Sequence, residues 1–280
     1  MAETPSNQGV YFLSLSVENV RCFAEKQTLD LSDGNGRPAQ WTVILGDNGT
    51  GKSTILDIAH HIFRASFFHQ SILARANVNK KPELKANLIE GHGLSSLKNT
   101  YRDLGEFGFY NISERPGYIK ENLTRDDTQS LQIKLHESAF YAYSASRRLE
   151  KKYKHDLGGG DVELPIDDPD NLINAEEWLL QTDYIANKPS EIQESYKKRL
   201  TIIKDTLIAL LPDVSDIRIS TPSEKSPNPR VEFKLPDGWL LLSQLSLGYQ
   251  TMTAWMVDLA AQLFKHYPNS PNPIAEPAVV

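Results

Sequence analysis

The sequence contains almost no cysteine. Cys22 is the only cysteine among the 280 residues, so the chain cannot form an internal disulfide. Zinc sites built from paired cysteines, or from cysteines and histidines at ligand spacing, are excluded for the same reason. A chain of this kind fits a reducing compartment, and we expect a cytoplasmic protein.

Long apolar runs and an excess of positive charge are also missing. No stretch of about eighteen apolar residues occurs, and residues 1–7 have neither the basic start nor the apolar core of a signal peptide. We therefore expect no membrane span and no secretion signal. The formal net charge is -6, so the composition neither predicts nor excludes binding of nucleic acid.

The remaining composition is that of an ordinary folded protein. Hydrophobic residues make up 40% of the chain and charged residues 24%, which argues against a disordered or fibrous chain. A length of 280 residues is sufficient for one large α/β domain with an inserted lobe, or for two modest domains.

A glycine-rich motif stands between an apolar run and a helical pattern. Residues 46–53 read G-D-N-G-T-G-K-S and match the G-x-x-x-x-G-K-S/T pattern of a phosphate-binding loop. The preceding run, 41–45, is apolar and β-branched, as expected of a strand buried on both faces. Apolar residues then recur at helical spacing over 55–63. Strand, loop and helix in this order are the context that the motif requires.

Each residue type in this loop suits the chemistry of phosphate binding. The glycines let successive N–H groups point at phosphate oxygens, at the positive end of the following helix. The Lys52 ammonium is expected to reach the β- and γ-phosphates, and the Ser53 hydroxyl is a hard oxygen ligand that suits Mg²⁺. We therefore expect ATP and Mg²⁺ as cofactors, although a plain glycine turn between strand and helix remains the alternative. The predicted phosphate-site residues are Gly46, Asp47, Asn48, Gly49, Thr50, Gly51, Lys52, Ser53 and Thr54.

Periodicity places further elements along the chain. Alternating or apolar runs predict strands and a hairpin at 11–17, 28–31, 131–135, 140–143 and 229–242. Helical spacing predicts helices at 175–185 and 191–211, the second ended by a proline. Turn signals fall at 90–93 and 114–117, and an acidic Gly/Pro-rich loop at 158–170 marks a boundary.

A second motif opens a strongly apolar helix near the end of the chain. Residues 245–249 read L-S-L-G-Y, which alone is consistent with an ordinary Ser N-cap. Together with the glycine loop, the motif resembles the L-S-x-G signature of ABC-type ATPases. Residues 15–23 resemble the opening strand and N-F-R-x-F corner of the SMC/RecF/OLD-like branch, and 141–147 resemble a strand-to-Arg segment of its AAA-15/21-like group.

This resemblance implies a fold, an assembly and further site residues. The implied fold class is α/β: a P-loop NTPase with an ABC-ATPase-like mixed sheet, an antiparallel flank and a small helical insertion. The implied assembly is a head-to-head dimer with ATP between the glycine loop of one subunit and the signature helix of the other. Ser246 and Gly248 would cap the γ-phosphate in trans, and Arg21 of the corner joins the nucleotide-binding set.

The resemblance also suggests how the chain is divided. We expect an N-terminal ATPase lobe at 1–150, a helical insertion at 151–225, and a hairpin, signature helix and further strand at 226–280. Helices of the predicted lengths are too short for the coiled-coil arms of SMC proteins. This favours the compact relatives, many of which resemble ATPase subunits of bacterial anti-phage defence systems that work with nucleases.

One expected catalytic element is missing from the sequence. Hydrolysis in this family implies an apolar strand ending in Asp-Glu, in which Asp orders Mg²⁺ and Glu positions water. No such run occurs, and 278–280 resembles the start of that strand, so we expect a longer parent polypeptide. Catalytic residues therefore stay unassigned, and whether the chain hydrolyses ATP stays open.

Three functional hypotheses remain at this stage. The first is an ATP-gated head of a DNA-repair or phage-defence complex, with an effector protein such as a nuclease, and DNA or RNA, as candidate partners. The second is an ATP-sensing scaffold that closes without turnover, and the third is a small-molecule kinase, which would be a monomer. Weaker signals have simpler explanations: the basic run at 147–155 predicts a solvated loop, and His60–His61 predict packing or surface exposure rather than a metal site.

Overall fold

The computed structural model divides the chain into two compact units, which are described separately. The first comprises Met1–Tyr141 with Ala275–Val280, and the second comprises Ala142–Ile274. In the described part of the chain, no helix is both long and apolar enough to cross a membrane. The structure describes residues 9–63, 82–91, 134–135, 137–143, 172–222, 224 and 227–280, and only the backbone of 101–112, 115–119, 148–149 and 171.

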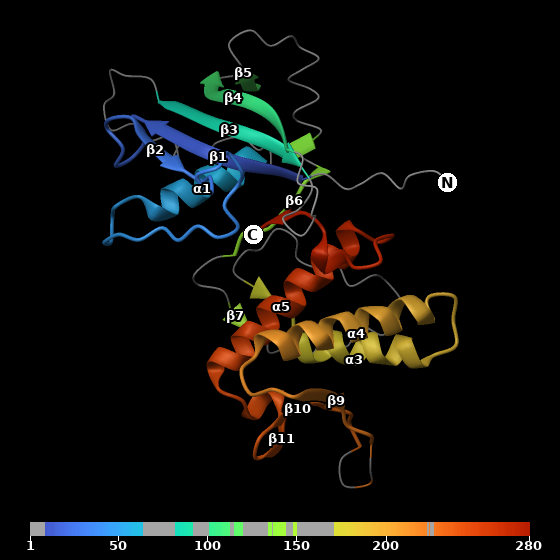
Figure 1. Ribbon diagram of the computed structural model, residues 1–280. Helices are drawn as coiled ribbons and strands as arrows, with labels where there is room; N and C mark the ends of the chain where they lie inside the picture. Colours follow the sequence, from blue (N-terminus) through green and yellow to red (C-terminus); the bar gives the residue numbers. More distant parts are fainter. Residues whose placement is uncertain are drawn as a thin grey trace. The chain divides into compact units, whose positions relative to one another are not determined.

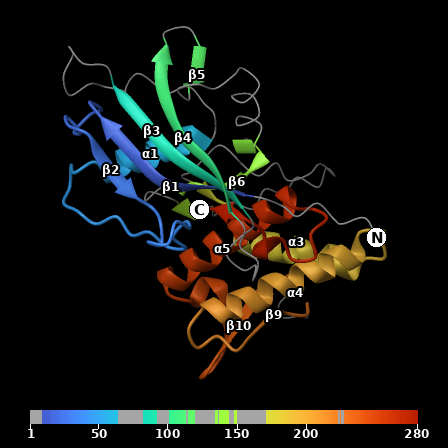
Figure 2. The same ribbon diagram turned by 45° about the horizontal axis from the view of Figure 1, so that its top comes forward.

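An antiparallel sheet forms the larger part of the first unit (Figure 1). Its five strands follow the order β2-β1-β3-β4-β5, as the turned view in Figure 2 also shows. The predicted strands at 11–17 and 28–31 are confirmed, because β1 and β2 pair with Leu15 opposite Leu29. The turn signal at 114–117 is wrong in part, since Pro116 and Gly117 pair with β4 inside β5. The strand bounds are β1 Gly9–Glu18, β2 Gln27–Asp30, β3 Glu83–Gly91, β4 Tyr101–Ile112 and β5 Arg115–Ile119.

Helix α1, Lys52–Phe63, packs against this sheet and confirms the helix that the apolar spacing over 55–63 predicts. Its residues Ile58, Ile62 and Phe63 are buried in one cluster with apolar residues of β1 and β3. The Phe63 ring stacks on Phe140 at 4.5 Å between centroids and meets Phe12 edge-on at 5.1 Å. Aromatic pairs of this kind add to the free energy gained by burial. This packing fixes α1, and therefore the place where the glycine loop ends.

A short parallel pair completes the first unit. Strand β6, Ala139–Phe140, pairs with β12, Ala278–Val279, so the strand predicted at the end of the sequence is confirmed. The strand predicted at 140–143 is confirmed only at Phe140, because 141–143 have no regular secondary structure. The prediction of a strand at 131–135 is wrong at 134–135, which form a helical turn, whereas 131–133 lie outside the described residues. Ser138 closes this turn, because its hydroxyl donates to the carbonyl oxygen of Lys134 at 2.7 Å.

The predicted buried strand at 41–45 is not a strand, and this is the largest correction to the sequence analysis. Trp41, Val43 and Leu45 are 81%, 76% and 87% exposed. Among the described residues, the segment forms no strand pairing. A parallel strand depends on neighbours along both edges, and β propensity without neighbours does not form one.

The second unit combines helices with a small antiparallel sheet of order β11-β10-β9. The predicted helices and the hairpin at 229–242 are confirmed. Gly238 follows the two-residue hairpin turn with a φ of +134°, a conformation that favours glycine. The main elements are α3 Ala175–Asn187, α4 Gln193–Leu210, β9 Asp216–Ile219, β10 Val231–Leu235, β11 Gly238–Leu241 and α5 Leu247–His266. The short elements are β7 Arg148–Leu149, β8 Asn171–Leu172 and two 3-10 turns, Leu242–Gln244 and Pro273–Ala275.

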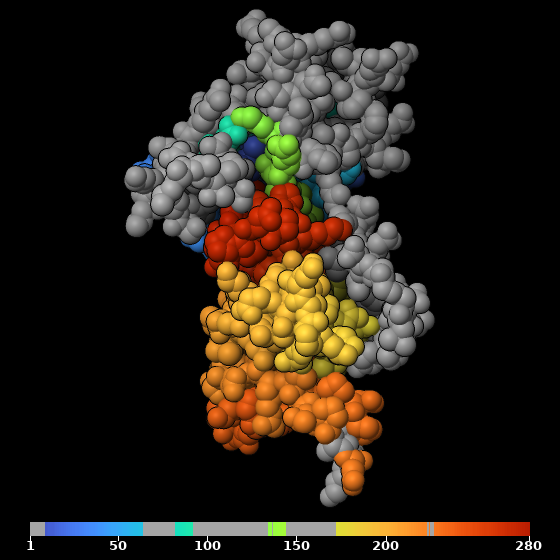
Figure 3. Space-filling view, turned by 90° about the vertical axis from the view of Figure 1, so that its right-hand side faces the viewer, coloured from blue at the N-terminus to red at the C-terminus, as the bar shows by residue number. Residues whose placement is uncertain are grey.

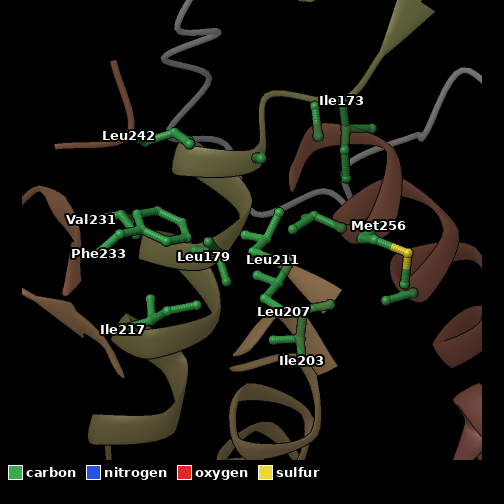
Figure 4. Packing of buried hydrophobic residues seen from close by; sticks show 14 of the residues in the cluster. Ile173, Leu179, Ile203, Leu207, Leu211, Ile217, Val231, Phe233, Leu242 and Met256 are labelled. Carbon is green, nitrogen blue, oxygen red and sulfur yellow. The ribbon is translucent and has the colours of Figure 1, made fainter. Parts of the chain in front are cut away.

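One hydrophobic core joins α3, α4, β9, β10 and α5 of the second unit (Figure 4). Leu179 of α3 lies beside Phe233 of β10, Leu207 of α4 lies in the middle of the cluster, and Met256 of α5 lies at its other side. On the face shown in Figure 3, the surfaces of α3 and of the small sheet are continuous. The signature helix α5 is therefore held by the same core as the helical pair and the hairpin.

A buried carboxylate adds polar contacts to this core. Asp258 of α5 accepts hydrogen bonds from the Tyr143 hydroxyl at 2.9 Å, the Ile173 N–H at 3.3 Å and the Gln262 amide at 2.6 Å. A buried charge is tolerated only when it is hydrogen-bonded in this way. Asp258 therefore ties α5 to the segments on either side of residues 144–171.

Removing this carboxylate should destabilise the second unit. We expect Asp258→Ala to lower the free energy of unfolding by about 3 kcal/mol, because three donors lose their acceptor in a buried place. Denaturant unfolding monitored by tryptophan fluorescence measures the effect, since Trp178, Trp239 and Trp255 all lie in this unit. Asp205→Ala, on the exposed side of α4, is the control and should change stability by no more than about 0.5 kcal/mol. Equal midpoints for the two variants would contradict the role given to Asp258.

Candidate functional site

The glycine loop adopts a conformation that its three glycines make possible. Gly49 and Gly51 have φ angles of +85° and +94°, in the left-handed region that residues with a Cβ rarely adopt. A Cβ on Gly46 would lie 2.7 Å from the Thr50 hydroxyl oxygen. Two glycines are thus required by backbone conformation, and the third by a close contact within the loop.

Lys52 turns back over the loop that precedes it. Its ammonium donates to the carbonyl oxygens of Gly46 at 2.8 Å and Asp47 at 2.6 Å. The Thr50 hydroxyl also donates to the Asp47 carbonyl, at 2.9 Å. These contacts place a positive charge directly over the loop, which is where an anion bound by the loop would need it.

The loop ends at the positive end of α1. The helix begins at Lys52, has no acidic residue in its first turn, and forms its hydrogen bond from Ile55 N–H to the Gly51 carbonyl at 3.0 Å. The first N–H groups of a helix have no partner within the helix and favour a bound anion. Ser53 is exposed at this end, so its hydroxyl is accessible to a cation, whereas Thr54 is buried.

A tight corner between β1 and β2 packs against the loop. Val20 and Phe23 exchange backbone hydrogen bonds of 3.1 and 2.8 Å, while Asn19 and Arg21 have φ angles of 53° and 46°. Left-handed backbone is uncommon for residues other than glycine, so this turn is strongly specified. A Cβ on Gly51 would touch the Phe23 ring and lie 2.7 Å from the Cys22 sulfur.

The corner brings Arg21 to α1. Its Nη1 donates to the Thr54 hydroxyl oxygen at 3.2 Å and lies 3.4 Å from the Asp57 carboxylate. Arg21 was assigned to the nucleotide only by resemblance, and the structure brings it to the first turns of the helix that follows the loop. Asp57 was not singled out in the sequence. The only local signal for it was its spacing, three residues after Thr54 and therefore on the same helix face.

The signature residues lie at the start of α5, in the second unit. Ser246 occupies the N-cap position, with φ -60° and ψ 156°, but its side chain makes no capping hydrogen bond. The ordinary N-cap explanation of this serine therefore lacks the bond on which it depends. Ser246 and Gly248 are exposed, as is Leu247 between them at 70%. Beneath them, the Gln250 side-chain amide donates to the Leu245 carbonyl at 2.7 Å and holds the turn together.

The two histidines are partly buried and make contacts within the first unit. His61 Nδ1 lies 2.7 Å from the Asp57 carbonyl oxygen, and the His60 ring lies 5.8 Å from that of Phe140. Within the described residues, no group of three His, Cys, Asp or Glu side chains is placed to hold a metal ion. The basic run at 147–155 lies outside the described residues, apart from the backbone of 148–149.

The fold and the loop together define the class of protein. A glycine loop that enters a helix beside a sheet, with a lysine over it, is the arrangement typical of the phosphate site of P-loop NTPases. The predicted α/β fold class is confirmed, and the predicted family is confirmed at the level of an AAA-type ATPase domain. The chain belongs to the AAA domain family AAA_23, whose sequence profile matches residues 14–215.

Solved structures include distant likenesses. The SMC head domain from Thermotoga maritima is 14% identical, with a TM-score of 0.37, over 92% of this chain and 74% of that one. The recombination mediator protein RecF with ATP, from the RecFOR pathway, is 13% identical, with a TM-score of 0.37, over 100% of this chain and 85% of that one. No curated protein matches the chain.

The contact between loop and corner can be tested at the glycines. We expect Gly51→Ala to destabilise the first unit by about 1–3 kcal/mol more than Gly49→Ala, because only the Gly51 side chain would meet Cys22 and Phe23. Both variants carry similar backbone strain, because both φ angles are positive. Gly49→Ala adds no steric contact to this strain, because nothing lies within 4 Å of a Cβ on Gly49. Denaturant unfolding provides the comparison. Equal losses would show that the corner yields to the added methyl group at no cost.

Proposed function

We propose that this chain is an ATP-binding head that closes as a head-to-head dimer around ATP and thereby gates a DNA-repair or phage-defence complex. The observation that carries the proposal is the Lys52 ammonium held over the glycine loop at the start of α1. Family membership supports nucleotide binding of the same kind. The partner complex follows only from the resemblance found in the sequence.

The residues of the loop fit a triphosphate with magnesium. Glycine backbone supplies a cradle in which a Cβ would be strained at Gly49 and obstructed at Gly51. Lys52 neutralises phosphate charge, and the exposed Ser53 hydroxyl provides a hard oxygen for Mg²⁺. Bound ATP would supply the γ-phosphate, whose charge distinguishes ATP from ADP. Loop N–H groups that are not used within the loop would face it, whereas the Thr50 N–H donates to the Asp47 carbonyl oxygen at 3.4 Å.

The signature residues supply the proposed dimer contact. Ser246 and Gly248 lie exposed at a helix N-terminus, and the serine hydroxyl is not used to cap its own helix. A helix end of this kind is suited to a γ-phosphate presented by a second subunit. The exposed apolar side chain of Leu247 lies between them and would be covered in the closed dimer. ADP lacks the γ-phosphate, so it would not hold the dimer closed.

A second candidate is an ATP-sensing scaffold that closes without turnover. It needs only the glycine loop and the exposed start of α5, and no catalytic carboxylate. Parallel measurements of ATP binding and phosphate release by the chain separate the two candidates. Binding without release favours the scaffold, and release at rates typical of the family excludes it. In either case we propose a cytoplasmic protein, with a nuclease or other effector, and DNA or RNA, as candidate partners.

Lysine 52 is the decisive residue for nucleotide binding. We expect Lys52→Ala to weaken Mg–ATP binding by about ten- to a hundredfold, because a charge-assisted phosphate contact is lost. Lys26→Ala removes the same charge from an exposed place in the first unit and should leave affinity unchanged. Isothermal titration calorimetry measures both. Unchanged affinity in Lys52→Ala would refute the proposed nucleotide site.

The dimer contact can be tested apart from nucleotide binding. We expect Ser246→Arg to abolish Mg–ATP-dependent dimerisation and to leave the ATP affinity of the monomer unchanged, since a long side chain blocks the helix end. Ser190→Arg, in the exposed turn between α3 and α4, is the matched control. Sedimentation velocity with Mg–ATP and with Mg–ADP gives the oligomeric state. A Ser246→Arg protein that still dimerises with ATP would exclude this helix end from the interface.

A further inference from the structure

Arg21 and the first two turns of α1 form a connected group of polar side chains beside the phosphate loop. We propose that Asp57 is a positioning residue, which holds the Arg21 guanidinium against α1 so that Arg21 can meet the terminal phosphate of ATP. The inference rests on the proposed nucleotide site and names a residue that acts on it through another side chain.

Both ends of the Arg21 side chain are fixed. Its backbone belongs to the tight corner, where Val20 and Phe23 are paired and the φ angle of Arg21 is 46°. Its Nη1 is shared between Thr54 Oγ1 at 3.2 Å and Asp57 Oδ2 at 3.4 Å. Thr54 and Asp57 are three residues apart on α1, so they present two acceptors on one face of the helix.

The contact is suited to orienting Arg21 and contributes little to stability. The side chains of Arg21 and Asp57 are 31% and 48% exposed, and an ion pair this exposed contributes little to folding. Arginine has many rotamers, however, and each one that is excluded before binding removes an ordering cost from binding. A guanidinium that is already in place can approach a phosphate with its planar set of donors.

Asp57 also carries a negative charge, and a negative charge repels the phosphates of ATP. Repulsion of ATP by this carboxylate would lower affinity, and its removal would then raise affinity. Asp57 belongs to the second turn of α1, beyond the first turn that would face a phosphate, and it is half-exposed, so its field is screened. Lys52 supplies the compensating charge at the loop. A loss of ATP affinity on removal of the Asp57 carboxylate therefore indicates orientation of Arg21, and a gain indicates repulsion of ATP.

The first measurement compares two nucleotides. In the full chain, we expect Asp57→Asn to weaken Mg–ATP binding by about three- to tenfold and Mg–ADP binding by less than about twofold, because only ATP presents the γ-phosphate. Asp57→Glu should recover most of the ATP affinity, and Arg21→Lys should show the same ATP-selective loss as Asp57→Asn. Glu25→Gln, which removes an exposed charge near the corner, is the control and should change neither affinity.

The second measurement is a double-mutant cycle with Arg21. We expect Asp57→Asn to have no further effect on ATP affinity in an Arg21→Ala chain, because Asp57 acts through that guanidinium. An equal loss in both backgrounds, an equal loss for ATP and ADP, or a gain in ATP affinity would each overturn the inference. The Lys52→Ala result is independent of this cycle. If Lys52→Ala binds ATP normally, the nucleotide site itself fails; if Lys52→Ala loses binding and the cycle is additive, only the role of Asp57 fails.

Discussion

The close approach of Gly51 to the β1–β2 corner is the contact on which the site depends. Because Gly51 has no side chain, Cys22 and the Phe23 ring can lie against it, and its φ of +94° turns the loop into α1. The same corner holds Arg21 at a left-handed backbone position. The absence of a Cβ at Gly51 therefore lets the loop, the start of α1 and the corner that carries Arg21 pack together. Movement of the loop would displace the corner.

In the second unit, buried contacts likewise hold the helix that carries the exposed site residues. The start of α5 is exposed, but its buried face shares a core with α3, α4 and the small sheet, and Asp258 adds three hydrogen bonds. The exposed Ser246 and Gly248 are thus carried on a rigid support, although neither makes a contact that stabilises the helix through a side chain. Surface residues that are held firmly, and whose side chains are not used to cap their own helix, are suited to recognition of another molecule.

Patterns in the sequence predicted the elements that depend on interactions between nearby residues. The glycine loop, α1, the helical pair and the hairpin follow from spacing and turn residues, so the sequence was sufficient for them. The run at 41–45 and residues 134–135 were assigned wrongly, because a strand depends on neighbours and a turn on the Ser138 hydroxyl, which periodicity does not report. The pairing of Arg21 with Asp57 joins residues 36 positions apart, and only the folded corner brings them together.

The two sides of the phosphate loop are held in different ways, and this asymmetry gives Lys52 a second role. The side that enters α1 is anchored by the buried residues Ile58, Ile62 and Phe63. The side that leaves 41–45 has no strand pairing among the described residues, and its apolar side chains are exposed. Lys52 belongs to the anchored side and bonds the carbonyls of Gly46 and Asp47 on the other. Its ammonium therefore holds the loop closed and also gives it a positive charge. When a phosphate replaces the two carbonyl oxygens as the partner of this ammonium, the first half of the loop is the part that is free to adjust.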